Sequence, residues 1–242
     1  MLKNLVNLTN NILCFSDVIL SFYCLSMVDT IRLGMKERCP LCNSMSEMFY
    51  EDTQRYCRCP KCRAIFVIKE DLPKSDAEKE RYELHDTDTQ DSGYRKFVSP
   101  ITTAILRDFT KKDSGLDFGS GTSAIISVVL REHGYKIKNY DPYFYNHPEY
   151  LNESYDYISS CEVIEHFYHP YQEFQRLRAM LKEGGKLYLM TDIYDERDFG
   201  SWYYKNDPTH VFLYTKETFQ WIKSHFGLKE LHIDKRFISF SA

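Results

Sequence analysis

Residues 116–124 read LDFGSGTSA, and this stretch decides the fold that the sequence predicts. Gly119 and Gly121 follow a short strand predicted over 115–119 and precede a helix predicted over 122–134. Glycines in a strand-to-helix turn leave the backbone uncovered, so a ligand can approach it closely. The stretch therefore predicts a ligand-binding loop at the edge of a sheet.

Strand and helix patterns alternate on both sides of this loop. Thr122 is placed to cap the helix after the loop, and Gly134 is placed to end it. Further elements are expected in the following order: strands over 135–141 and 155–161, a helix over 169–185, a strand over 186–191, a helix over 215–227 and a final hairpin within 228–241. The buried face of the 169–185 helix is predicted to carry Tyr171, Phe174, Leu177 and Leu181. Such alternation predicts an α/β fold with a Rossmann-like parallel sheet and helices on both faces.

Two acids next to the glycine loop indicate what it binds. The loop also fits G-x-G-x-x-A, the dinucleotide fingerprint, so a nicotinamide-dependent dehydrogenase is one alternative. Asp117 argues against it, because an acid at the strand end repels a pyrophosphate and attracts an ammonium group. Asp141 closes the next strand, twenty residues after Gly121, where a carboxylate can accept hydrogen bonds from ribose hydroxyls. The residues favour a nucleoside with a positive charge.

These motifs are similar to those of a known family. Residues from about 97 to 235 resemble a class I S-adenosylmethionine-dependent methyltransferase, with D-x-G-x-G in the loop, an acid after the second strand and EVIEHF after the fourth. The resemblance implies a Rossmann-like methyltransferase sheet and a cofactor site made of Asp117, Gly119, Gly121, Asp141 and Glu162.

The chain departs from the family pattern in two places. The third glycine usual in the loop is Ser123 here, which tightens the loop without blocking a ligand. Only thirteen residues separate Asp141 from Tyr155, so the third strand and its helix are expected to be abbreviated. The adenine pocket is correspondingly hard to assign from the sequence.

The segment CEVIEHF, residues 161–167, carries two carboxylates and an imidazole. In a helical turn, Glu162, Glu165 and His166 would share one face. The segment resembles the E-x-x-E-H of ubiquinone-pathway O-methyltransferases and small-RNA 2′-O-methyltransferases, which implies metal-assisted activation of a hydroxyl. With His210 they are suitable ligands for Mg²⁺ or another divalent ion. In one alternative, the segment only closes the cofactor pocket and His166 makes a local hydrogen bond. In another, His166 or His210 is a metal-free general base. The catalytic candidates are therefore Glu165, His166 and His210.

The N-terminal third contains two C-x-x-C pairs, CPLC and CPKC, with sixteen residues between them. Each pair forms a tight turn that presents two sulfurs, as in four-thiolate zinc sites. The predicted ligands of a structural Zn²⁺ are Cys39, Cys42, Cys59 and Cys62. Cys57 is expected to point away, although it could replace one ligand, and Cys161 is expected in the core.

Composition and pattern divide the chain into an uncertain leader (1–34), a zinc-ribbon-like module (35–73), a linker (74–96) and a methyltransferase domain (97–242). The apolar stretch over 12–28 is interrupted by Asp17 and several serines, so it is too short and too polar for a membrane span. Reduced cysteine pairs indicate a reducing compartment. We expect a cytoplasmic protein that does not bind membranes.

Three functions are compatible with these motifs. The first is methyl transfer to an oxygen or carbon of a small-molecule or glycan acceptor, with the module helping to present the acceptor. Aromatic side chains in DFGSWYYKNDPTHVFLY, residues 198–214, could wall its pocket: Trp202, Tyr203, Tyr204, Phe212 and Tyr214. In the alternative they form a packed lid without substrate contacts, a role expected for about half of them. The net charge of −4 argues against a general polyanion-binding surface.

The second function is RNA methylation, with RNA held by the cations of the module: Arg55, Arg58, Lys61, Arg63 and Lys69. Phosphate contacts of this kind would give a steep salt dependence of binding. The third is a non-catalytic protein that uses the module for protein contacts. The presence of the loop acid, the ribose acid and the EVIEHF motif makes this third function the weakest.

Overall fold

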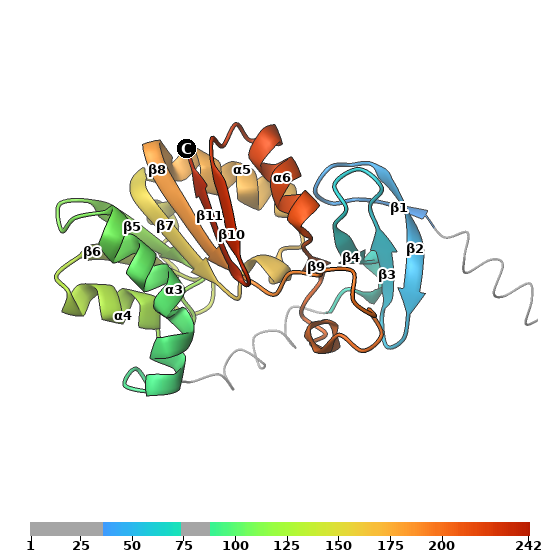
Figure 1. Cartoon of the computed structure of the whole chain (residues 1–242), viewed down its shortest axis with the longest axis horizontal. Coiled ribbons are helices and arrows are strands. Elements are labelled where there is room, and N and C mark those ends of the chain that lie inside the picture. Colours follow the sequence, from blue (N-terminus) through green and yellow to red (C-terminus); the bar gives the residue numbers. More distant parts are fainter. Residues whose placement is uncertain (1–35, 74–87) are drawn as a thin grey trace, which may run out of the picture.

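The structure is a computed structural model that describes residues 36–73 and 88–242, so the predicted leader and most of the predicted linker lie outside the described residues. Figure 1 shows a large sheet with helices on both faces and a small sheet from the N-terminal part of the chain. The strand orders are β10-β11-β8-β7-β5-β6 and β1-β2-β3-β4-β9. The predicted α/β fold with a small N-terminal module is confirmed.

The large sheet contains the strands that the sequence predicts. They are β5 (Ser114–Phe118), β6 (Lys136–Tyr140), β7 (Tyr155–Cys161), β8 (Leu181–Met190), β10 (Leu231–Asp234) and β11 (Phe237–Ser241). The first four pair in parallel, and β10 and β11 form the predicted antiparallel hairpin at the edge beyond β8. Between β6 and β7, where every residue is described, the chain makes only the 3-10 helix η2 (Pro148–Asn152) and no strand of the sheet. The expected abbreviation is confirmed.

Helices cover both faces of this sheet because its strands alternate their side chains between the two faces. On one face Tyr157 and Tyr188 pack with the helices α3 (Ser92–Asp108) and α4 (Ile125–Glu132). On the other face Ile158 and Leu187 pack with α5 (Pro170–Met180) and α6 (Lys216–His225). Among the described helices, none combines the length and apolarity that a membrane span requires.

Two predicted helices have wrong boundaries. The helix after the glycine loop begins at Ile125 instead of residue 122, because Ala124 adopts the left-handed conformation (φ 44°). Thr122 therefore does not cap it.

The predicted 169–185 helix ends at Met180, and Leu181 already pairs with Tyr155 as the first residue of β8. Gly184, at φ +75°, is incompatible with a continued helix. Of the four residues predicted to form its buried face, Phe174 and Leu177 are buried, but Tyr171 is 37% exposed and Leu181 belongs to the strand.

The small sheet takes one strand from the far end of the sequence. Its strands are β1 (Lys36–Arg38), β2 (Met45–Glu51), β3 (Arg55–Arg58), β4 (Ile65–Val67) and β9 (Phe212–Leu213). We call residues 36–68 the cysteine module and residues 198–214 the aromatic loop. β9 is the end of the aromatic loop, so the module and the large domain share a hydrogen-bonded sheet.

Gly115 in β5 leaves room for the ring of Tyr157, its partner on β7. An added Cβ would lie 2.0 Å from Tyr157 Cε2. We expect Gly115→Ala to lower the free energy of unfolding by about 1–3 kcal/mol, measured by urea denaturation, because the ring must move within a packed core. In a Tyr157→Leu background the same substitution should cost much less, and equal costs in the two backgrounds would contradict this explanation.

Candidate functional site

A cavity of about 700 Å³ opens at the carboxyl ends of β5, β6 and β7. Most of the predicted site residues line it: Asp117, Gly119, Gly121, Asp141, Glu162, His166 and His210. Glu165 is fully buried and does not line the cavity. The strand ends thus bring predicted residues from four separate segments to one site, as expected for ligand sites in open α/β sheets.

The glycine loop gives the cavity a wall of bare backbone. Gly119 has φ +72°, and a Cβ there would lie 2.5 Å from the side chain of Val163. Gly121 has φ +62°, and a Cβ there would meet no atom within 4 Å. Gly119 is therefore required for packing against the EVIEHF segment, whereas Gly121 keeps its backbone open to the cavity.

Asp117 lies at the base of the cavity and is 3% exposed. Its carboxylate accepts hydrogen bonds from the hydroxyls of Ser159 (2.9 Å) and Ser127 (3.1 Å). Burial raises the pKa of Asp117 to about 6, and the two hydroxyls offset only part of this effect. A cation in the cavity would stabilise the ionised form.

Asp141 joins two loops at the side of the cavity. One carboxylate oxygen accepts from the Gly121 backbone N–H (3.1 Å), and the other accepts from the N–H groups of Tyr143 (2.9 Å) and Phe144 (3.1 Å). The oxygen that faces Gly121 has one of its two lone pairs left for a further donor. Asp141 therefore fixes the loop and keeps one acceptor position at the cavity.

The EVIEHF segment does not form the predicted helical face. Glu162 has a left-handed backbone (φ 53°), and only Ile164–His166 form a 3-10 turn, η3. Glu162 Oε2 accepts from Arg236 and from the hydroxyl of Tyr204. Its Oε1 is buried and has no hydrogen-bond partner in the described part of the chain. Burial, followed by the nearby Glu165 carboxylate, raises the pKa of Glu162.

Glu165, His166 and His210 come together from two segments of the chain. Each offers one ligand atom, and these atoms lie within 4.8 Å of one another. Glu165 Oε1 accepts from the Tyr204 hydroxyl, and its buried Oε2 makes no hydrogen bond to the residues that the structure describes. Glu162 is not part of this group, because its carboxylate is held by Arg236. The four-residue divalent set expected from the sequence is thus reduced to three.

Both imidazoles are oriented by backbone carbonyls. His166 Nδ1 lies 2.9 Å from the carbonyl oxygen of Thr209, and His210 Nδ1 lies 2.7 Å from that of Tyr204. Since a carbonyl only accepts, the neutral form of each ring carries its hydrogen on Nδ1 and its lone pair on Nε2. The ring centres are 4.9 Å apart.

Aromatic residues of the 198–214 loop do not wall the cavity, so that prediction is wrong. Tyr203 is 58% exposed, and the other four are buried: Trp202, Tyr204, Phe212 and Tyr214. The loop packs against the cysteine module, where Tyr56 and Val67 belong to the same apolar cluster as Trp202 and Tyr204. Burying these rings against the module removes more apolar surface from water than an open pocket wall would.

Other residues line the cavity that sequence reasoning missed. Aromatic rings come from the start of α3, from the DPYFY segment after β6 and from the end of EVIEHF: Tyr94, Phe97, Tyr143, Phe144 and Phe167. DPYFY comes directly after the acid that ends β6, and this position in the sequence indicates that its aromatic rings lie at the cavity. Cys161 lies on β7 and packs against the core, as predicted, but it is only partly buried because it also lines the cavity.

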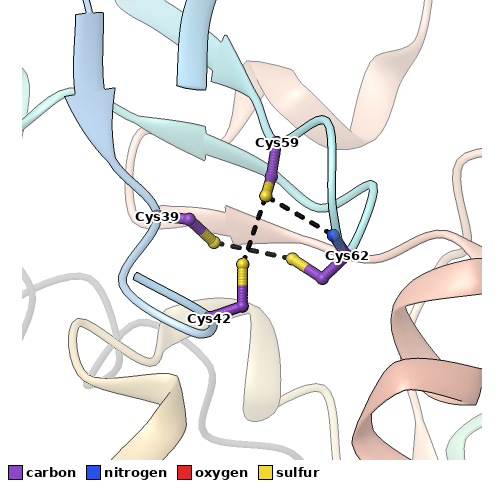
Figure 2. A group of neighbouring side chains, drawn as sticks. All are labelled: Cys39, Cys42, Cys59 and Cys62. Atoms are coloured by element: carbon purple, nitrogen blue, oxygen red, sulfur yellow. Dashed lines mark hydrogen bonds between the residues drawn. The ribbon is translucent and has the colours of Figure 1, made fainter. Parts of the chain in front are cut away.

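The four predicted zinc ligands gather at one end of the cysteine module (Figure 2). Cys42 and Cys59 have their sulfurs 3.3 Å apart, and those of Cys39 and Cys62 are 3.5 Å apart. These distances are close to the roughly 3.8 Å between sulfurs that surround a tetrahedral zinc ion at about 2.3 Å. Cys57 is buried on β3 and lies outside the group, which confirms that it points away.

The two turns that carry these cysteines have the same construction. Cys39 N–H donates to the Ser44 carbonyl (2.9 Å), and Cys59 N–H donates to the Ala64 carbonyl (2.8 Å). The residue after the second cysteine of each pair has a left-handed backbone, at φ 59° for Asn43 and φ 62° for Arg63. Two matched turns present four thiols to one point.

The comparisons agree with this fold. A family model described as "Methyltransferase domain" matches residues 90–233. No curated protein matches the sequence. Solved structures that are similar include an O-methyltransferase family protein from Burkholderia thailandensis, with 12% identity, a TM-score of 0.50, and 72% of this chain and 64% of that chain covered.

Human N-acetylserotonin methyltransferase in complex with SAM is 13% identical with a TM-score of 0.47, and the match covers 69% of this chain and 56% of that chain. A SAM-dependent methyltransferase from Archaeoglobus fulgidus is 17% identical with a TM-score of 0.47, and the match covers 57% of this chain and 71% of that chain. The first three solved structures are matched over 55%, 64% and 56% of their own length. At 12% identity and a TM-score of 0.50, the likeness to the Burkholderia thailandensis protein shows the fold alone.

Proposed function

The chain belongs to the methyltransferase-domain family, and from this premise we propose that it transfers a methyl group from S-adenosylmethionine to an oxygen or carbon of a small-molecule or sugar-linked acceptor. One observation carries the proposal. A bare glycine loop, two buried strand-end acids and two imidazoles line one cavity of a size suited to a nucleoside and a small acceptor.

The residues at the glycine-loop end fit S-adenosylmethionine. Gly121 leaves room for the cofactor against the backbone, and Asp141 keeps an acceptor position for a ribose hydroxyl. Asp117 supplies negative charge for its ammonium group, and the orphaned Oε1 of Glu162 supplies a hydrogen-bond acceptor. When bound, the cofactor supplies an activated methyl group on a sulfonium centre.

At the other end, Glu165, His166 and His210 fit a divalent metal ion. The two rings each hold Nδ1 against a carbonyl, the arrangement by which metal-binding histidines fix their tautomer and present Nε2. Glu165 Oε2 is a buried oxygen that lacks a hydrogen bond to the described residues. A bound ion would lower the pKa of an acceptor hydroxyl. The protein's part is to hold the ligands and to keep Glu165 in place through Tyr204.

Cys39, Cys42, Cys59 and Cys62 fit a structural zinc ion. Four soft ligands in two tight turns, with the measured sulfur separations, are the donor set of closed zinc sites. The module is small, and its apolar core is continuous with that of the large domain. We propose that zinc stabilises the module and has no direct part in catalysis.

RNA methylation is less well supported than a small acceptor. Of the five cations that made the module basic, three are paired with carboxylates: Arg55 with Asp71, and Arg58 and Arg63 with Glu196. Such pairs reduce the positive charge available to phosphates. A small-molecule or glycan acceptor therefore remains the preferred proposal.

Binding of S-adenosylhomocysteine, measured by calorimetry between pH 5 and 8, tests the cofactor site. We expect 1:1 binding that weakens below about pH 6, because protonation of Asp117 removes the charge that faces the ammonium group. Asp117→Asn should bind weakly at every pH, and the exposed control Glu183→Gln should behave as the wild type. Absence of binding at every pH would refute the proposed cofactor.

The same pKa has a predictable effect on stability. The folded pKa of about 6 lies above the ordinary value of 3.8, so the unfolded chain ionises first as pH rises. The contribution of Asp117 to the free energy of unfolding is therefore largest below about pH 4 and is lost by about pH 6. The free energy of unfolding of Asp117→Asn, measured by urea denaturation, should lack this decrease between about pH 4 and pH 6.

A further inference from the structure

The cysteine module is bonded to the aromatic loop through the backbone. Ile65 and Phe66 of β4 pair with Leu213 and Phe212 of β9. The N–H of Val67 extends this ladder with a 2.9 Å bond to the carbonyl of Val211. The residue directly before this bonded stretch is His210.

A second set of contacts holds the loop on the other side of His210. Lys205 is 5% exposed, and its ammonium group pairs with Asp52 in the turn between β2 and β3. The hydroxyl of Tyr56 donates to the Lys205 carbonyl (3.0 Å), and the amide of Gln54 donates to the Pro208 carbonyl (3.2 Å). A buried ammonium is costly without a charged partner, so Lys205 depends on Asp52.

From this held stretch, hydrogen bonds lead directly to the catalytic candidates. The Tyr204 carbonyl accepts from His210 Nδ1 (2.7 Å), and the Thr209 carbonyl accepts from His166 Nδ1 (2.9 Å). The Val211 N–H donates to the carbonyl of Glu165 (2.9 Å). The part of the loop that the module holds by hydrogen bonds and an ion pair is therefore the part that orients both imidazoles.

Without the module, the loop would have few regular contacts to hold it. It belongs to the connection from Met190 at the end of β8 to Lys216 at the start of α6. Apart from β9 and an isolated bridge between Ile193 and Tyr214, this connection contains only the short 3-10 helix η4 (Tyr203–Asn206). Connections longer than about 12–15 residues without their own secondary structure are uncommon in compact domains. The cysteine module supplies contacts to this connection.

We propose that the cysteine module is a clamp on the aromatic loop, and that Asp52 and Tyr56 are positioning residues for His210. The proposal rests on the role given above to His210, but its test does not depend on catalysis or on the identity of the metal. Neither residue lines the cavity, so each acts only through Lys205 and the loop backbone.

The test uses the full chain labelled with ¹⁵N-histidine, in which long-range ¹H–¹⁵N spectra report which nitrogen of each ring carries the hydrogen. Wild type should show His166 and His210 as Nδ1–H tautomers. In Asp52→Asn we expect the His210 spectrum to show a mixture of tautomers instead of the Nδ1–H tautomer alone. The Val211 amide should exchange about ten-fold faster, because the loop opens locally. Asp52→Glu should restore both, and Tyr56→Phe should give the same changes in weaker form.

Two controls separate positioning from unfolding and from failure of the proposed function. Asp195→Asn removes an acid of the same connection that pairs with Arg197, also in that connection, and it should change neither signal. Amide exchange in α4 and affinity for S-adenosylhomocysteine should stay within about two-fold of wild type in Asp52→Asn, because the contacts it loses lie in the loop. Unchanged His210 tautomer and Val211 exchange in both Asp52→Asn and Tyr56→Phe would overturn the clamp.

Discussion

A Cys39→Ser/Cys59→Ser protein should contain no zinc, and its cysteine module should be unfolded. Each substitution removes one ligand from a different turn, so neither C-x-x-C pair can chelate the ion. Zinc binding to small four-ligand modules is worth about 10–16 kcal/mol at neutral pH, far more than a core of this size supplies. We expect this to be the largest stability effect of any substitution discussed here.

Metal content of the purified protein and amide exchange over residues 36–68 are the measurements. The wild type should carry one zinc ion per chain, and the variant none. Cys57→Ser is a matched control, because Cys57 is buried within the same small sheet but lies outside the thiol group. It should retain zinc and the wild-type exchange pattern. A wild-type protein without zinc, or a double variant as protected as wild type, would disprove the site.

Local spacing explains why much of this molecule can be predicted from the sequence. The two C-x-x-C pairs, the glycine loop and the acid at the end of β6 are each encoded within a few residues, and the structure brings each group to its expected position. The alternation of strands and helices is sufficient to predict the parallel sheet, because parallel strands connected by helices have few possible arrangements.

The contacts that cannot be predicted join distant segments. β9 pairs with β4 although some 150 residues separate them, and a two-residue strand has no pattern of its own. The sequence suggests that the aromatic loop lines the cavity because such loops often cover ligands, but the cysteine module offers it a larger apolar surface. Arg236, from the turn between β10 and β11, engages Glu162 and so removes it from the expected metal set.

The burial of Glu165 escapes prediction for a related reason. The sequence places it beside His166, and periodicity suggests that both face the same way. In the 3-10 turn η3 the imidazole lines the cavity, whereas the carboxylate is buried and accepts a hydrogen bond from Tyr204, although the two ligand atoms stay within 4.8 Å of each other. Tyr204 of the aromatic loop, 39 residues further along the chain, contacts the carboxylate and helps to bury it.

Glu165→Gln and His210→Gln should each lower methyl transfer by about 10²–10⁴-fold while affinity for S-adenosylhomocysteine stays unchanged. Gln at 165 keeps an oxygen that can accept from Tyr204 but has no charge for a metal ion, and Gln at 210 removes the oriented imidazole. Incubation with labelled S-adenosylmethionine and separate pools of metabolites, glycans and RNA identifies the pool that contains the acceptor. The methyl-transfer rates of wild type and variants are then compared with that pool.

Chelation distinguishes the metal from a metal-free base. If a divalent ion at Glu165, His166 and His210 activates the acceptor, EDTA treatment under which the zinc content of the cysteine module stays constant should lower wild-type turnover to the level of Glu165→Gln, and added Mg²⁺ or Mn²⁺ should restore it. The Glu165→Gln rate should then be insensitive to EDTA, since it has already lost the ion. His225→Gln, which alters an exposed histidine on α6, is the control and should keep full turnover. Wild-type turnover that is unaffected by EDTA, together with an active Glu165→Gln protein, would exclude the metal and leave His210 as the base.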